Sequence, residues 1–238
     1  MTGGSQHARL RLPERSPLRR LLERVSGSVL FGWALLTLLL LPYLDNKIIG
    51  IPVAKLLLAA VFVSAFGVRG VSQLGIAILG SAIVFGNVDE LSPSTAAFVA
   101  AASLRALALG YTGVVSLREA LRERQVTVHT IARAASVYLL IGFFWSQIYA
   151  IADRIEPGSL SVPQHWMTTD PNARLRYLYF SFVTLATLGF GDVVPAQPGL
   201  AALTLVEALV GQLYMATLIA RLVALHTVAS RPAEHEGE

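Results

Sequence analysis

The amino-acid sequence predicts an all-α integral membrane protein with six membrane-spanning helices and a shorter apolar segment between the fifth and the sixth. Composition is the first observation behind this fold class. Of 238 residues, 54% are hydrophobic and 14% are charged, and the mean hydropathy is +0.60, well above that of soluble proteins. The second observation is that the apolar residues gather in stretches of the length that a bilayer requires.

A helix needs about 20 apolar residues to cross the ~30 Å hydrocarbon core. Five stretches come close to that length, and one is shorter. They are residues 25–44, 48–66, 93–117, 131–152 and 199–223, with the shorter stretch at 71–85. The segment 153–198 is polar at first and then apolar at 175–188, which is too short to cross. We expect it to enter the membrane and return on the same side.

Basic residues beside the spans indicate the orientation, because cytoplasmic loops retain Lys and Arg. The arginine-rich arm of residues 1–24, the linker and the tail fall on one side, and the acidic turn of Asp89 and Glu90 falls on the other. We therefore expect a multi-pass protein of the cell membrane with both termini cytoplasmic. The arm suits an anionic lipid surface better than nucleic acid, because an apolar segment follows it at once.

A charged linker divides the chain into two blocks. In order, the predicted parts are a cytoplasmic arm (1–24), a four-helix transmembrane domain (25–117), a cytoplasmic linker (118–130), a second transmembrane block (131–223) and a short cytoplasmic tail (224–238). Arg118 and Arg122 are one helical turn apart, beside Glu119 and Glu123. This spacing predicts either a short helix along the cytoplasmic face or a helical extension of the fourth span.

The run TLATLGFGD, residues 184–192, interrupts the apolar pattern with glycine. Non-helical backbone lies at membrane depth only where protein buries it or where it lines an aqueous cavity. Gly189 and Gly191 can adopt positive φ angles, so that successive carbonyl oxygens can point the same way. Such a row, spaced by roughly 3 Å per residue, can replace the water around a bare cation. One chain supplies one wall, so a closed ring requires several copies.

This run resembles the potassium-channel signature, Thr-x-x-Thr-x-Gly-Tyr/Phe-Gly-Asp, and residues 131–223 are similar to the pore module of that family. The chain looks like a bacterial-type six-transmembrane channel with a two-transmembrane pore module. The resemblance implies a re-entrant pore helix at about 175–186, a selectivity filter after it, and a homotetramer around one pore. K⁺ is then the permeant ion, and no cofactor is expected.

Carried over residue by residue, the resemblance implies that the carbonyl groups of four filter residues bind K⁺. These are Thr187, Leu188, Gly189 and Phe190, and Gly191 would close the outer mouth. Thr187 also adds a hydroxyl at one end of the row.

The filter is expected to be supported from behind by Asp192, Thr184, Tyr179 and Phe180. Many relatives carry two tryptophans where this chain has Tyr179 and Phe180, and a filter tyrosine where it has Phe190. Neither Phe180 nor Phe190 can offer a polar group to the other. We therefore expect more apolar packing than hydrogen bonding behind the filter, unless Tyr179 reaches Asp192.

The last predicted span carries two further candidates. Gly211 lies twenty residues after Gly191, where the family has a hinge glycine, so it is either a gating hinge or a place where helices approach closely. Glu207 is an intramembrane ionisable group, one turn earlier. It either faces the cavity or forms hydrogen bonds with the pore helix near Thr184 or Ser181, and we favour the second because an isolated buried charge costs more. Gln212 is expected to serve helix packing.

Steep voltage gating is not expected, because one charge contributes only ~2.3 kcal/mol per 100 mV. Arg105 is alone in the fourth span, which makes the first block a degenerate form of a voltage sensor. We expect Arg105 to pair with a carboxylate or to reach toward an interface.

No catalytic constellation stands out, and the chain has no cysteine for a thiolate metal site. We therefore expect a potassium-selective channel and no enzyme. Three alternatives stay open: a nonselective cation channel, a non-conducting regulatory subunit that keeps the pore fold, and a transporter that uses the broken segment as a midplane site. The intact Thr-Leu-Gly-Phe-Gly run argues against all three.

Overall fold

The computed structural model describes residues 17–40, 75, 78, 80–82, 94–123, 127–164 and 174–229. These residues are mostly helical. The helices are α1 (Pro17–Leu40), α4 (Thr95–Arg122), α5 (Val128–Ile155), α7 (Arg174–Leu185) and α8 (Pro198–Ala229). Two short strands, β1 (Leu160–Ser161) and β2 (Val194–Pro195), form an antiparallel pair.

Three helices in the described part of the chain are long and apolar enough to cross a membrane, namely α4, α5 and α8. They correspond to the predicted spans at 93–117, 131–152 and 199–223. The apolar segment of each covers 28 residues, which is about 42 Å of helix and exceeds the ~30 Å core of a bilayer.

The other predicted spans are covered in part or not at all. Helix α1 begins at Pro17, inside the predicted arm, and its described apolar part, Ser28–Leu40, is shorter than a full span. The predicted span at 48–66 lies outside the described residues. Of the span at 71–85, residues 75, 78 and 80–82 are described, all as helix. The count of six spans stays a prediction.

The linker between the two predicted blocks continues α4. The helix runs on to Arg122 and ends at Glu123, whose backbone is extended (φ −70°, ψ 129°). Helix α5 begins soon after, where the hydroxyl of Thr127 accepts a hydrogen bond from the Thr130 N–H at 3.2 Å. Of the two linker interpretations, the helical extension is confirmed for residues 118–122 and the separate surface helix is wrong there.

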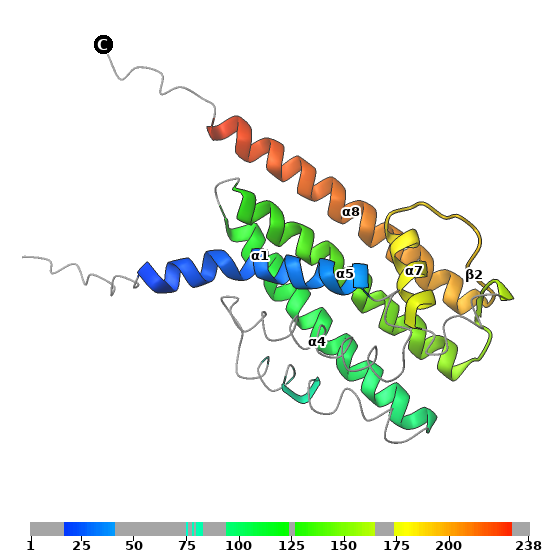
Figure 1. The fold of residues 1–238 in the computed structure, drawn as a ribbon. Coiled ribbons are helices and arrows are strands. Elements are labelled where there is room, and N and C mark those ends of the chain that lie inside the picture. The colour runs from blue at the N-terminus through cyan, green and yellow to red at the C-terminus, as the bar shows by residue number, and fades with distance from the viewer. Residues whose placement is uncertain are drawn as a thin grey trace, which may run out of the picture.

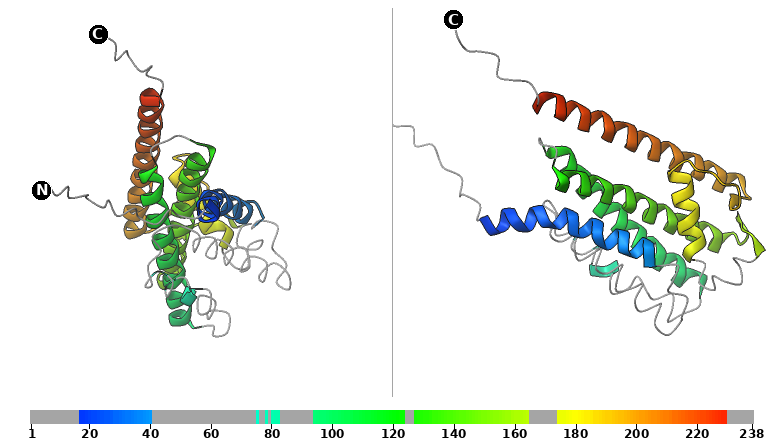
Figure 2. Two further views of the ribbon diagram at one scale, coloured as in Figure 1. Left: turned by 90° about the vertical axis from the view of Figure 1, so that its left-hand side faces the viewer. Right: turned by 45° about the horizontal axis from the view of Figure 1, so that its top comes forward.

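Helices α4 and α5 are neighbours, and the other helices are arranged around them (Figure 1). Helix α1 packs on α5, and Leu30, Leu109 and Leu140 meet in a buried cluster between α1, α4 and α5. Helix α7 lies between α5 and α8 at one end of the molecule (Figure 2).

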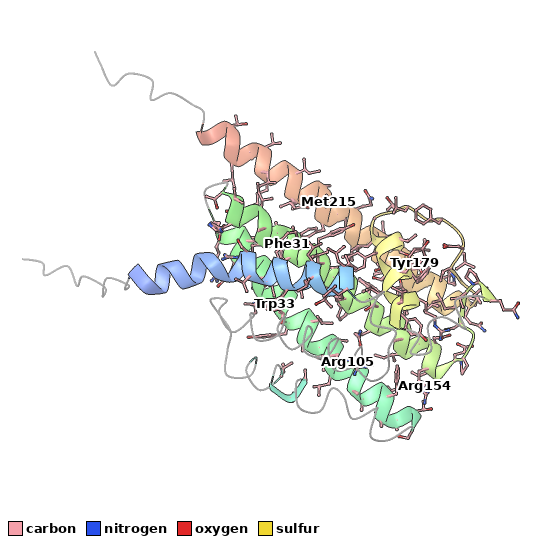
Figure 3. All side chains as sticks on the ribbon, viewed as in Figure 1. Phe31, Trp33, Arg105, Arg154, Tyr179 and Met215 are labelled. Atoms are coloured by element: carbon pink, nitrogen blue, oxygen red, sulfur yellow. The ribbon has the colours of Figure 1, made fainter. Side chains whose placement is uncertain are left out.

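Helix α8 is largely uncovered in the single chain. Only 6% of its apolar segment is buried. Its exposed apolar side chains, among them Met215 in Figure 3, therefore face lipid or another chain.

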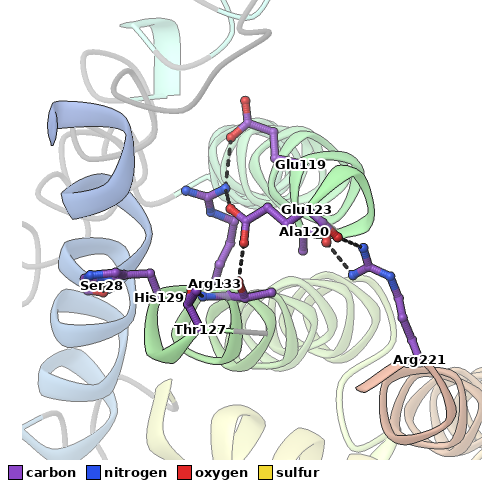
Figure 4. Close-up of polar contacts among 9 residues, drawn as sticks. Ser28, Glu119, Ala120, Glu123, Thr127, His129, Arg133 and Arg221 are labelled. Carbon is purple, nitrogen blue, oxygen red and sulfur yellow. Dashed lines mark hydrogen bonds and ion pairs between the residues drawn. The ribbon is translucent and has the colours of Figure 1, made fainter. Parts of the chain in front are cut away.

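At the end of the molecule opposite α7, buried Arg133 of α5 forms ion pairs with Glu123 at 2.5 Å and Glu119 at 3.6 Å (Figure 4). Arg221 of α8 donates to the backbone carbonyls of Ala120 and Glu123, the second at 2.6 Å. A helix leaves its last carbonyls without intrahelical partners. The guanidinium of Arg221 therefore connects the C-terminal part of α8 to the C-terminal end of α4.

Replacing Arg221 by Met is expected to lower the free energy of unfolding, because two carbonyl groups lose a charged donor. We expect a loss of about 1.5 kcal/mol, at the low end for hydrogen bonds to charged groups because Arg221 is half-buried. Denaturation in mixed detergent micelles measures the change. Arg118→Met, on the exposed side of α4, is the control and should leave stability unchanged; equal stability of the two variants would contradict the tie.

Candidate functional site

The segment between α5 and α8 forms a short helix and a returning loop. Helix α7 has 12 residues, close to the predicted 175–186. Its last residue, Leu185, contacts α8 at Gly211, where an added Cβ would lie 2.5 Å from the Leu185 carbonyl oxygen. Gly211 is roughly 20 Å along α8 from Pro198. The chain therefore runs beside α8 to its middle, and the loop brings it back to the start of α8 (Figure 1).

The end of α7 is closed by hydrogen bonds from the loop itself. The N–H of Thr187 donates to the carbonyl of Thr184, and that of Leu188 to the carbonyl of Val183, both at 2.9 Å. This is the Schellman pattern of a helix C-terminus, with Thr187 in the left-handed position that usually holds glycine. Thr187 has φ +55°. The sequence analysis missed this angle, although the position directly after a helix end is the signal for it.

These hydrogen bonds fix the direction of the carbonyl groups in the loop. In a trans peptide the C=O points opposite to the N–H of the same unit, and the described backbone has no cis peptide. Since the N–H groups of Thr187 and Leu188 point to α7, the carbonyls of Ala186 and Thr187 point away from it. The N–H of Gly189 also faces Val183, at 3.5 Å, which turns the carbonyl of Leu188 the same way.

Positive φ angles recur at every second residue of this run. Thr187, Gly189 and Gly191 have φ of +55°, +55° and +79°. The predicted backbone of Gly189 and Gly191 is confirmed. All residues from 186 to 192 are exposed in the single chain, so the row of peptide groups lies on an open side of the molecule.

Gln212 holds the inner end of the loop. Its amide nitrogen donates to the hydroxyl of Thr187 at 3.1 Å, while that hydroxyl donates to the carbonyl of Ala186 at 2.7 Å. Gln212 is exposed. Its expected role in helix packing stays a prediction. Its contact with Thr187 was missed because it joins residues 25 positions apart.

At the far end of the loop from Gln212, Asp192 is bound to α7. The Tyr179 hydroxyl donates to one carboxylate oxygen of Asp192 at 2.7 Å, and the Val193 N–H donates to the other at 3.0 Å. Burial and this hydrogen bond raise the pKa of Tyr179 to about 12, so the phenol keeps its proton near neutral pH and remains the donor. The conditional prediction that Tyr179 reaches Asp192 is confirmed.

The aromatic residues expected behind the filter are placed differently. Phe180 is buried, and its ring packs on Tyr149 of α5 with centroids 4.8 Å apart. Phe190 is 65% exposed. Within one chain the two rings therefore do not face each other. Because Tyr179 reaches Asp192, the stated exception to the expected apolar packing applies.

Asp153, near the end of α5, supports the outer frame of the loop. One carboxylate oxygen accepts from Tyr177 at 2.6 Å and from Arg176 at 3.3 Å, both on α7. The other accepts from the Gly158 N–H at 3.1 Å. Strand β1 then pairs with β2, directly after the filter run. This role of Asp153 was not predicted from the sequence.

Glu207 is fully buried on α8, one turn before Gly211. Its carboxyl oxygens lie 2.5 Å from the Ser181 hydroxyl of α7 and 2.5 Å from the Tyr149 hydroxyl of α5. The preferred interpretation, hydrogen bonding to the pore helix at Ser181, is confirmed. Thr184, the other candidate, instead accepts the Thr187 N–H through its backbone carbonyl.

Residues 126–227 match a family model described as "Ion channel". The matched segment contains α5, α7 and α8 with the loop between them. No curated protein matches the chain, and no solved structure matches it either. The match supports an ion-channel family for this part of the chain. Together with the apolar helices, it indicates a membrane protein of the ion-channel class.

Replacing Tyr179 by Phe is expected to loosen the loop, because Asp192 loses a hydrogen-bond donor. A loss of about 1 kcal/mol corresponds to roughly fivefold faster local opening. Amide hydrogen exchange of residues 186–193 measures it. Tyr138→Phe on α5, whose ring packs on Tyr214 outside the loop, is the control. Equal exchange in both variants would refute the bracing role of Tyr179.

Proposed function

We propose that this protein is a potassium-selective channel of the cell membrane, in which four copies of the chain surround one pore. The observation that carries the proposal is the run 187–191, in which positive φ angles alternate along an exposed loop. The carbonyls of Thr187 and Leu188 point away from the helix that supports them. A row of such oxygens can replace the hydration shell of a monovalent cation.

In this proposal K⁺ is bound by the carbonyl groups of Thr187, Leu188, Gly189 and Phe190, with Gly191 at the outer mouth. The side chains of Leu188 and Phe190 contribute packing and no ligand atoms. Tyr179 and Asp192 hold the outer end of the row, and Gln212 holds the inner end at Thr187. The resemblance to the potassium-channel signature favours K⁺ over a mixture of cations.

The open surface of one chain supports assembly, and the resemblance to the potassium-channel family favours four copies. The loop lies on an open side of the chain, and α8 beside it is largely uncovered and apolar. Its exposed side chains include Leu205, Leu209 and Leu213. Other copies would cover this surface and bring their own carbonyl rows to the same axis.

The orientation proposed from the basic residues places both termini in the cytoplasm. The end of α4, the start of α5 and the last turns of α8 meet at one end of the molecule, which supports a common side for them. Filter residues 187–191 lie toward the other, outer side.

Gating is proposed not to depend steeply on the membrane voltage. Arg105 is buried and donates to the amide oxygen of Gln147 at 3.0 Å, so it is placed as a packing residue between α4 and α5. A bend of α8 at Gly211 is proposed as the gate. The close contact of Gly211 with Leu185 explains this glycine equally, because no larger residue fits there.

Reconstitution in liposomes with a potassium gradient tests the function. We expect a barium-sensitive current whose reversal potential follows K⁺ and not Na⁺. Absence of current across a range of pH and voltage would overturn the channel proposal. A reversal near zero with K⁺ and Na⁺ on opposite sides would replace it by a nonselective channel.

Gly189→Ala is expected to abolish conduction or selectivity while the tetramer persists, because a left-handed backbone costs a residue with a Cβ about 1–2 kcal/mol. Gly199→Ala is the matched control, since an added Cβ there meets nothing within 4 Å. Current and reversal potential are measured for both, with the oligomer followed by native mass spectrometry. Unchanged selectivity in Gly189→Ala would refute the filter assignment.

A further inference from the structure

One buried ionisable group has no part in the proposed binding of K⁺. Glu207 of α8, Tyr149 of α5 and Ser181 of α7 are each fully buried, and they meet side chain to side chain. They come from the three helices that frame the filter loop. The Ser181 hydroxyl also lies 2.9 Å from the backbone carbonyl of Gly142 on α5.

Counting hydrogen atoms decides the state of the carboxyl group. Three oxygen–oxygen contacts need three hydrogens: Tyr149 with Glu207 Oε2, Ser181 with Glu207 Oε1, and Ser181 with the Gly142 carbonyl. The two hydroxyl groups supply two. With an ionised Glu207, one contact would bring two oxygens together without a hydrogen between them.

A carboxylic acid supplies the missing hydrogen. Tyr149 then donates to Oε2, the acid donates from Oε1 to Ser181, and Ser181 donates to the Gly142 carbonyl. Each hydrogen is used once, and each contact is a hydrogen bond.

The surroundings favour the same state. Among the residues that the structure describes, no ion pair of Glu207 is found, whereas Arg133 pairs with Glu119 and Glu123. An unpaired carboxylate in a buried membrane site costs several kcal/mol more than a hydrogen-bonded neutral acid, on the order given for isolated buried charges.

We propose that Glu207 is an uncharged carboxylic acid that positions α7, and through it the filter, against α5 and α8. The inference rests on the proposed channel function. Ser181 is one turn before the end of α7, and Gly211, one turn after Glu207, packs against Leu185 at that end. Two successive turns of α8 therefore hold the last turn of α7, from which Thr187 continues directly into the filter. Glu207 is a positioning residue and touches no ion.

Three variants test the role of the neutral acid. Glu207→Gln keeps the size, lets the amide N–H donate to Ser181 and lets the amide oxygen accept from Tyr149, so we expect potassium flux within about twofold of the original chain. Glu207→Leu removes the acceptor of the Tyr149 hydroxyl and the donor to Ser181, which keeps only its contact with the Gly142 carbonyl. We expect flux to fall roughly tenfold or more, the change that about 1.4 kcal/mol produces. Tyr149→Phe should have an intermediate effect.

Infrared spectroscopy of the reconstituted protein at neutral pH detects the protonated carboxyl group itself, which a change in packing alone would not alter. The original chain should show the carbonyl stretching band of a protonated carboxylic acid, and Glu207→Gln should lack it. Glu156→Gln, which removes an exposed carboxyl group, is the control and should keep the band.

The outcomes separate the two proposals. A missing acid band in the original chain, or loss of flux in a folded, tetrameric Glu207→Gln variant, would overturn the inference while the channel function stands. An original chain that shows the band but carries no K⁺ would overturn the channel function and leave the neutral acid in place.

Discussion

The hydrogen bonds that close the end of α7 determine the rest of the site. The last carbonyl groups of a helix have no partners within the helix, so other groups must supply the donors. Here the donors are the N–H groups of Thr187 and Leu188. Because a peptide group is planar and trans, using these N–H groups on one side presents the carbonyl oxygens on the other. The same hydrogen bonds therefore cap the helix and orient the row of carbonyl oxygens.

The surrounding contacts keep this row in place at three levels. Gln212 binds Thr187 at the inner end, Tyr179 binds Asp192 at the outer end, and Asp153 joins the end of α5 to α7 and the β1–β2 pair. Each tie uses side chains from a different helix. The loop has no regular hydrogen-bond ladder of its own, so its rigidity comes from these neighbours and not from local propensity.

The sequence predicted those features whose cause is local or imposed by the membrane. The apolar stretches identified α4, α5 and α8 because a bilayer demands length and apolarity together. The backbone of Gly189 and Gly191 was predicted because glycine readily adopts positive φ angles. The hydrogen bond of Tyr179 was predicted only conditionally. The position of Tyr179 around the axis of α7 decides whether its hydroxyl points to Asp192.

The features that the sequence did not reveal depend on tertiary contacts. The left-handed Thr187 follows from the residue at which α7 ends, and helix ends are uncertain by one or two residues in any sequence-based assignment. The roles of Asp153 and Gln212 depend on chain segments that fold back on one another. The place of Phe180 depends on tertiary contacts as well, because its ring packs on Tyr149 of α5.

The need to satisfy polar backbone groups, which is met at the end of α7 by hydrogen bonds, also favours assembly of several copies of the chain. Within one chain, residues 186–192 present polar backbone on an exposed side, next to the uncovered apolar surface of α8. Lipid accepts the apolar surface but not the polar backbone, because each unsatisfied peptide group costs several kcal/mol in hydrocarbon, on the order of a lost hydrogen bond in an apolar medium. The two surfaces are adjacent, so contact between copies that covers α8 also shields the carbonyl groups from lipid. In the proposed tetramer those oxygens then face water and K⁺ on a common axis, which satisfies the peptide groups that a single chain leaves open.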